Sequence, residues 1–275
     1  MGGLSRHTLN AHVGSFGQLQ KGGDRLAAVR RTAVSITARN GRPTGRGGRM
    51  TGEPTPAVPP QLRAWLGLIA ALAAAVVVVL GVLYAGHSEP GMVDRWVQPA
   101  VDDVRPPWRQ VALAMDFLGE PAGAATLVVA AVAGCLLLRC PRAAALVMAG
   151  AGITLGMAAL LKHLVGRTIH GDGNLSYPSG HTAFATALAL VVALLATGRF
   201  GLGRTAGRLV VFASALVAGA AMGWAQVALG AHYPTDVLGG WCTALVVIPA
   251  TAWLIDRAAD RLGDRTADAG RRERR

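Results

Sequence analysis

Three polar clusters carry the residue types that could perform chemistry in an otherwise apolar chain. The first is "KHLVGR", with Lys162 and Arg167, and the second is "YPSGH", which ends at His181. The third is "HYPTDVLGG", in which His232 stands four residues before Asp236. Ammonium and guanidinium groups bind anions, and imidazoles act as nucleophiles or proton donors. This combination favours chemistry on a phosphate group.

The first two clusters offer ways to hold that phosphate. Lys162 and Arg167 supply positive charge, although cations at the ends of apolar segments also occur simply because they reach the membrane interface. In "PSGH", Ser179 can cap a following helix, and Gly180 lets the backbone approach an anion at the helix N-terminus. Capping alone would explain Ser179 but not His181.

The third cluster pairs an imidazole with a carboxylate. A carboxylate beside one imidazole nitrogen fixes the tautomer and raises the basicity of the other nitrogen, which makes His232 a candidate nucleophile oriented by Asp236. His181 is then available to protonate the leaving oxygen, so we expect these three residues to be catalytic. A metal site built from them remains an alternative, but their spacing matches no metal-binding motif.

Composition predicts that membrane helices position these clusters. Of the 275 residues, 52% are hydrophobic and 15% are charged, and the mean hydropathy is +0.40. The apolar residues come in blocks of about 20, the length that crosses a bilayer. We therefore expect an all-α, polytopic membrane protein with six transmembrane segments, near residues 64–85, 111–138, 143–161, 182–197, 209–229 and 237–255, the second interrupted by "MDFLGEPAG".

The ends of the chain differ from this central part. Residues 1–60 are rich in Gly, Arg, Thr and Pro, which predicts a disordered basic segment; translation starting at Met50 is an alternative. Residues 61–256 would form the membrane domain, and residues 257–275 a basic cytoplasmic tail. Basic surplus can indicate nucleic-acid binding, but here it flanks apolar segments, so we expect no nucleic-acid partner. Each of the three cysteines is expected to be a free or buried thiol.

The basic residues also predict orientation. With the N-terminus inside, cytoplasmic segments hold 22 Lys and Arg residues and outside segments hold five. This bias places both termini in the cytoplasm of a cell whose plasma membrane the chain crosses. The three polar clusters then share the extracytoplasmic side.

The three motifs, in this order and between these segments, resemble the type 2 phosphatidic acid phosphatase, or lipid phosphate phosphatase, superfamily over about residues 64–255. The resemblance implies a six-helix membrane fold, hydrolysis of a lipid phosphate without metal or other cofactor, and a phosphohistidine intermediate. It implies His232 as the nucleophile, Asp236 as its partner and His181 as the acid. Lys162, Ser179 and Gly180 would bind the phosphate of substrates such as phosphatidic acid, phosphatidylglycerol phosphate or polyprenyl diphosphates.

Two positions depart from the family pattern. The first family motif ends in Arg-Pro, where this chain has Ile169 and His170, and the third begins with Ser-Arg, where it has Ala225 and Gln226. We expect Arg167 and Gln226 to contact the phosphate instead. Because a neutral hydrogen bond is weaker than a charge-assisted one, a non-catalytic member that binds or transports anionic lipids is the alternative function.

Overall fold

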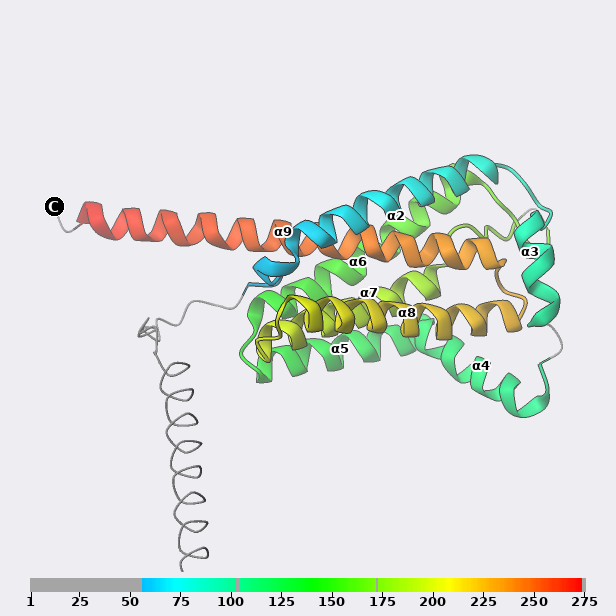
Figure 1. The fold of residues 1–275 in the computed structure, drawn as a ribbon, viewed down its shortest axis with the longest axis horizontal. Coiled ribbons are helices and arrows are strands. Elements are labelled where there is room, and N and C mark those ends of the chain that lie inside the picture. Colours follow the sequence, from blue (N-terminus) through cyan, green and yellow to red (C-terminus); the bar gives the residue numbers. More distant parts are fainter. Residues whose placement is uncertain (1–55, 102–103, 172, 274–275) are drawn as a thin grey trace, which may run out of the picture. The chain divides into compact units, whose positions relative to one another are not determined.

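The computed structural model describes residues 56–101, 104–171 and 173–273, which form helices and loops with one isolated β-bridge between Thr168 and Leu175. The long helices run side by side as a bundle (Figure 1). Two short 3-10 helices, η1 (Pro60–Leu62) and η2 (Gln98–Ala100), accompany them. The α-helices are α2 (Arg63–Leu83), α3 (Met92–Val97), α4 (Pro106–Gly119), α5 (Pro121–Leu137), α6 (Pro141–Val165), α7 (Gly180–Arg199), α8 (Arg204–Ala228) and α9 (Pro234–Glu273).

The helices confirm the expected polytopic membrane architecture. Five of those described are long and apolar enough to cross a bilayer, and α4 with α5 gives a sixth when the pair is taken as one bent span. The core lies where α2, α6, α7 and α9 meet, and includes Leu66, Leu146, Leu190 and Ile248. Many large apolar side chains on the outer faces are exposed, as expected for helices that face lipid.

The second span breaks where the sequence predicts an interruption. α4 and α5 meet at an angle of 66° around Glu120, which adopts an extended conformation. Pro121 explains this break, because the proline ring disfavours the helical conformation of the preceding residue. The bend turns α4 away from α5, so that α4 packs against α7 and α8.

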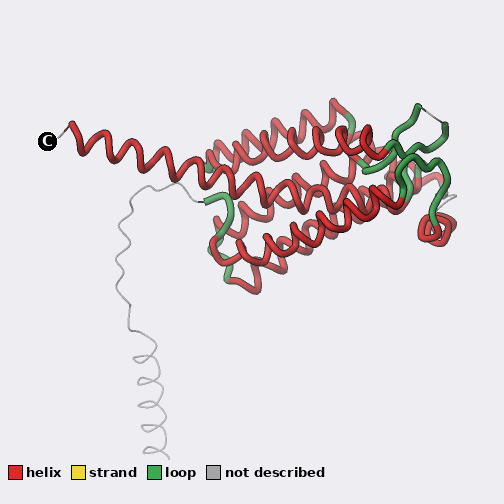
Figure 2. Tube along the Cα trace, turned by 90° about the horizontal axis from the view of Figure 1, so that it is seen from above, coloured by secondary structure: helices red, strands yellow, loops and turns green. Residues whose placement is uncertain are grey.

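The loops of interest gather at one end of the bundle. In Figure 2 they lie at the end opposite the C-terminal part of α9, which is also the end where Figure 1 shows the short helix α3. The segments that precede α7 and α9 and the one that follows α6 are all at this end. The three polar clusters are therefore on the same side of the bundle.

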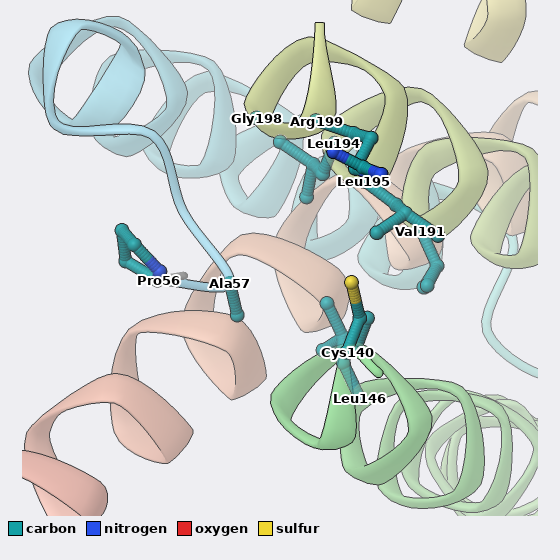
Figure 3. A pocket seen from close by; sticks show the side chains of 10 residues that line it. Pro56, Ala57, Cys140, Leu146, Val191, Leu194, Leu195, Gly198 and Arg199 are labelled. Carbon is teal, nitrogen blue, oxygen red and sulfur yellow. The ribbon is translucent and has the colours of Figure 1, made fainter. Parts of the chain in front are cut away.

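The other end is held by a buried carboxylate. Asp256 accepts hydrogen bonds from the backbone amides of Ala57, at 2.7 Å, and Val58, at 3.0 Å. Ala57 also lines a small pocket with Cys140 and Arg199 (Figure 3). Packing at this end therefore includes Ala57 and Val58, which precede the expected start of the membrane domain at residue 61. The predicted disorder of the preceding segment and the alternative start at Met50 concern residues outside the described ranges.

α9 continues far beyond its apolar part. Its helix runs to Glu273, past the ends of the neighbouring helices (Figure 1), so the predicted basic tail is helical over most of its length. All three cysteines, Cys135, Cys140 and Cys242, are buried and free, which confirms the sequence prediction.

Candidate active site

His232 and Asp236 lie at the junction of a tight turn and the first turn of α9. His232 Nδ1 is 3.8 Å from Asp236 Oδ2, within ion-pair range but longer than a hydrogen bond. The same carboxylate oxygen accepts a hydrogen bond from the Tyr233 amide at 3.0 Å, which fixes its direction. His232 is mostly buried, and its Nδ1 has no hydrogen-bond partner in the described structure.

Arg167 lies behind this pair and is completely buried. Its Nη1 donates to Asp236 Oδ1 at 2.6 Å and to Thr235 Oγ1 at 2.7 Å, and its Nη2 donates to Asp94 Oδ2 at 2.7 Å. The guanidinium carbon is also 4.0 Å from the centre of the Tyr84 ring. Two carboxylates and an aromatic face thus surround the cation.

Asp94 comes from α3, far from the motifs in sequence. Burial by itself raises the pKa of Asp94, but hydrogen bonds from Arg167, from the amide and hydroxyl of Thr235, and from the Gly91 amide hold the pKa below its ordinary value. Asp94 is therefore a carboxylate that binds α3 to the start of α9.

The "PSGH" segment forms the start of α7. Ser179 is its N-cap, as predicted, and its hydroxyl accepts a hydrogen bond from the Thr182 amide at 3.4 Å. The Ser179 amide donates to the backbone carbonyl of Asp236 at 2.9 Å, which joins this segment directly to α9. The amides of Gly180 and His181 lie in the first helical turn, where no carbonyl of the same helix can accept from them.

His181 faces α4 from this first turn. Its Nε2 is 3.4 Å from Asp116 Oδ1, but it makes no hydrogen bond within the described structure. A Cβ atom at Gly119 would overlap the imidazole ring, so glycine is required for α4 to pack this closely. Gln226 of α8 donates from Nε2 to the same Asp116 oxygen at 2.8 Å.

Lys162 reaches the site from the last turn of α6. Its Nζ donates to the Leu175 carbonyl at 2.9 Å and lies within electrostatic range of Asp236. Lys162, His232 and Asp116 all lie within electrostatic range of His181. The structure thus brings all three clusters together. Among the described residues, no three His, Cys, Asp or Glu side chains are grouped to hold a metal ion.

The PAP2 superfamily model matches residues 121–260, which include all three motifs and just over half of the chain. The chain belongs to the PAP2 superfamily. Its fold is similar to the crystal structure of the first transmembrane PAP2 type phosphatidylglycerolphosphate phosphatase from Bacillus subtilis, with a TM-score of 0.54 and 21% identity over 70% of this chain and 96% of the other. No curated protein matches the sequence.

The positions where this PAP2 chain departs from the family pattern have other structural roles. Ile169 is buried, and His170 Nε2 lies 2.8 Å from the Gly230 carbonyl oxygen, next to the turn that carries His232. Gln226 is almost fully buried and bonded to Asp116. Because Arg167 is enclosed by carboxylates, its contacts do not support the predicted role in phosphate binding.

Sequence reasoning missed two carboxylates that contact predicted site residues. Asp94 and Asp116 both lie before residue 121, outside the region that the family model matches. A weak signal for Asp116 was present, since an acid inside the apolar stretch "VALAMDFLG" is costly unless it has a partner. Asp94 carried no such signal, because it lies in a polar stretch between two apolar segments.

Proposed function

We propose that the protein is a membrane phosphatase that hydrolyses a phosphomonoester or diphosphate of a lipid through a phosphohistidine intermediate. The observation that carries this proposal is the pairing of His232 with a fixed carboxylate next to the start of α7. The start of α7 and the start of α9 are joined by the hydrogen bond that the Ser179 amide donates to the Asp236 backbone carbonyl. The proposed nucleophile therefore lies beside a helix N-terminus, the kind of structure that favours anions.

The chemical steps follow from the orientation of the two imidazoles. Asp236 faces Nδ1 of His232, which leaves Nε2 to attack phosphorus in line with the leaving oxygen. The P–N bond forms as the P–O bond breaks, and His181 transfers a proton to the departing oxygen. Water then attacks the phosphohistidine, with His181 as base, to release phosphate and regenerate His232.

The phosphoryl oxygens would be held by Lys162 and by the first free amides of α7. A Cβ atom placed on Gly180 would meet no neighbouring atom, so there is open space beside its backbone. The helix N-terminus adds a favourable dipole toward negative charge. Gln226 remains a proposed neutral donor, because its amide nitrogen carries a second N–H besides the one that bonds to Asp116.

In this proposal Arg167 has a positioning role instead of contacting phosphate. Its bond to Asp236 Oδ1 holds the carboxylate while Oδ2 faces His232. A guanidinium fork suits this bridging task, because it donates along fixed directions to two acceptors.

An apolar groove next to the site supports a lipid substrate. The groove has a volume of about 450 Å³ and lies between α4, α5, α7 and α8. It begins beside Asp116 and Gln226, since Met115 precedes Asp116 and Met222 Sδ is 4.0 Å from Gln226 Nε2. Its lining, apolar except for Ser214, fits a hydrocarbon chain, and includes Leu118, Leu127, Phe184, Leu188 and Val217.

The proposed location is the plasma membrane, with both termini in the cytoplasm and the site on the extracytoplasmic side. The distribution of basic residues supports this orientation, with 22 on the inner segments and five on the outer ones. Lipid phosphates in the outer leaflet would then reach the site from the groove.

Phosphate release from defined lipids tests the proposed function. Protein purified in detergent, with a chelator present, should release phosphate from at least one of phosphatidic acid, phosphatidylglycerol phosphate and a polyprenyl diphosphate. His232→Ala should slow release about 10³-fold or more, because it removes the nucleophile. His163→Ala is the matched control, since His163 is exposed on the neighbouring α6, and it should retain activity.

Two outcomes would contradict the proposal. Phosphate release by His232→Ala at the wild-type rate would exclude His232 as the nucleophile. Tight binding of these lipids with no release across a broad pH range would favour the alternative of a lipid-binding or lipid-transporting protein.

A further inference from the structure

Asp116 is a carboxylate shared between two residues of the proposed site. Its Oδ1 accepts from Gln226 of α8 at 2.8 Å and lies 3.4 Å from His181 Nε2 of α7. The side chain is about one quarter exposed, and so is that of His181. α4 therefore brings a negative charge to the imidazole that the mechanism uses as acid.

The surroundings of His181 make this contact distinctive. The charged or titratable groups within electrostatic range come from α4, the α4–α5 junction, α6 and the turn before α9. Burial, His232 and Lys162 oppose a positive charge on His181, whereas Asp116 and Glu120 favour it. Of the two acids, Asp116 is the one whose oxygen lies in ion-pair range of the ring.

Gln226 suits this arrangement because it carries no charge. An amide donor fixes the direction of the Asp116 carboxylate without cancelling its field. An arginine at position 226 would form an ion pair with the same oxygen and reduce the negative potential at His181. Gln226 and His181 can therefore both interact with Asp116 Oδ1 without one cancelling the effect of the other.

We propose that Asp116 is a positioning residue that orients His181 and favours its protonated form for transfer to the leaving oxygen, with Gln226 fixing the carboxylate. This inference rests on the proposed phosphatase function. The carboxylate also has an unfavourable side, because it repels a bound phosphate. Its removal should therefore weaken proton transfer and strengthen substrate binding at the same time.

Asp116→Asn tests the proposal because it keeps the shape and removes the charge. We expect kcat on the best lipid phosphate to fall about tenfold, less than the 10²- to 10⁴-fold that a whole general acid contributes. KM should fall or stay constant, and the decline of activity at alkaline pH should begin at lower pH. Glu120→Gln is the matched control and should change kcat less than about twofold, because an exposed charge is screened.

A second readout does not depend on activity. NMR titration of ¹⁵N-histidine-labelled protein in detergent, with the His181 signals assigned from His181→Gln, reports protonation of the ring directly. The titration midpoint of His181 should move to lower pH in Asp116→Asn and also in Gln226→Arg, but not in Glu120→Gln. Gln226→Arg keeps the test valid if Asp116→Asn does not fold.

The outcomes separate this inference from the proposed function. An active wild type whose His181 midpoint is unchanged in both variants would overturn the role of Asp116 and leave the phosphatase intact. An inactive wild type with the expected midpoint shift would support the contact but remove its catalytic meaning. A fall in kcat with a large rise in KM would indicate a merely structural residue and overturn the proposal.

Discussion

Two buried carboxylates on the same helix, Asp236 and Asp256, serve the two ends of the bundle in different ways. They are 20 residues apart on α9, which corresponds to about 30 Å along a helix, the thickness of a bilayer core. Both are nearly inaccessible to solvent. Each also contacts an arginine from α6 or from the loop that follows α6.

At Asp256 the partners are those of a structural anchor. Two backbone amides donate to the carboxylate, and Arg142 lies 3.4 Å away. Arg142 also reaches Asp260, so the ion pairs extend toward the exposed surface. Within the described structure, the hydrogen-bond and ion-pair partners of Asp256 include no imidazole.

At Asp236 the partners leave room for chemistry. One oxygen is held by Arg167, and the other faces His232 Nδ1, which has no hydrogen-bond partner in the described part of the chain. Buried polar atoms are usually satisfied, and an exception requires a reason. The comparison teaches that a buried carboxylate alone does not identify a site, whereas one that faces an unsatisfied imidazole is a strong candidate.

Replacing each carboxylate by its amide is the strongest test of the difference between Asp236 and Asp256. Asp236→Asn should reduce phosphate release about 10²- to 10⁴-fold, because the amide no longer holds His232 in the nucleophilic tautomer. Asp256→Asn should leave release unchanged and only lower the melting temperature. Equal losses of activity in the two variants would show that both ends act merely through folding.

The arginines that contact these two carboxylates, Arg167 and Arg142, should differ in how much each contributes to the free energy of unfolding. Arg167→Ala leaves two buried carboxylates without their cation and should lower the free energy of unfolding by about 3–5 kcal/mol. Arg142→Ala should cost about 1 kcal/mol, because backbone amides still satisfy Asp256. Unfolding in mixed detergent micelles measures both values. A cost for Arg142→Ala as large as that for Arg167→Ala would refute the distinction.

The smallest expected effect is a loss of stability at acidic pH that depends on Asp94. The folded pKa of Asp94 lies below its ordinary value of 3.8, so Asp94 contributes stability above that pH and loses it as the pH falls through the folded pKa. Between about pH 5 and the acid limit, wild type should therefore lose more stability than Asp94→Asn. Parallel acid profiles of the two proteins would mean that the Asp94–Arg167 contact does not form.

The fold could be predicted from the sequence because length and hydrophobicity determine what crosses a bilayer. The six apolar segments, the break before Pro121 and the cap at Ser179 all follow from local chemistry. The motif order also predicted the superfamily to which the chain belongs. The helical continuation of α9 to Glu273 was not predicted, because that part has no apolar period.

The site was less predictable, because its contacts join segments that are distant in sequence. Asp94 is 73 residues from Arg167, and Asp116 is 110 residues from Gln226. No local sequence pattern predicts contacts between residues so far apart. The sequence likewise cannot distinguish an arginine that faces a phosphate from one that faces two carboxylates, which is why the contacts of Arg167 led us to propose a positioning role for it.

Trapping the proposed phosphohistidine tests the central claim most directly. Wild-type protein is mixed with a lipid phosphate that it hydrolyses, and the reaction is quenched in alkali. The peptide that contains His232 should then carry one phosphoryl group. Asp236→Asn should carry less, and His232→Ala none. Rapid phosphate release by wild type with no phosphoryl group at His232, or with the group on His181 instead, would contradict the mechanism.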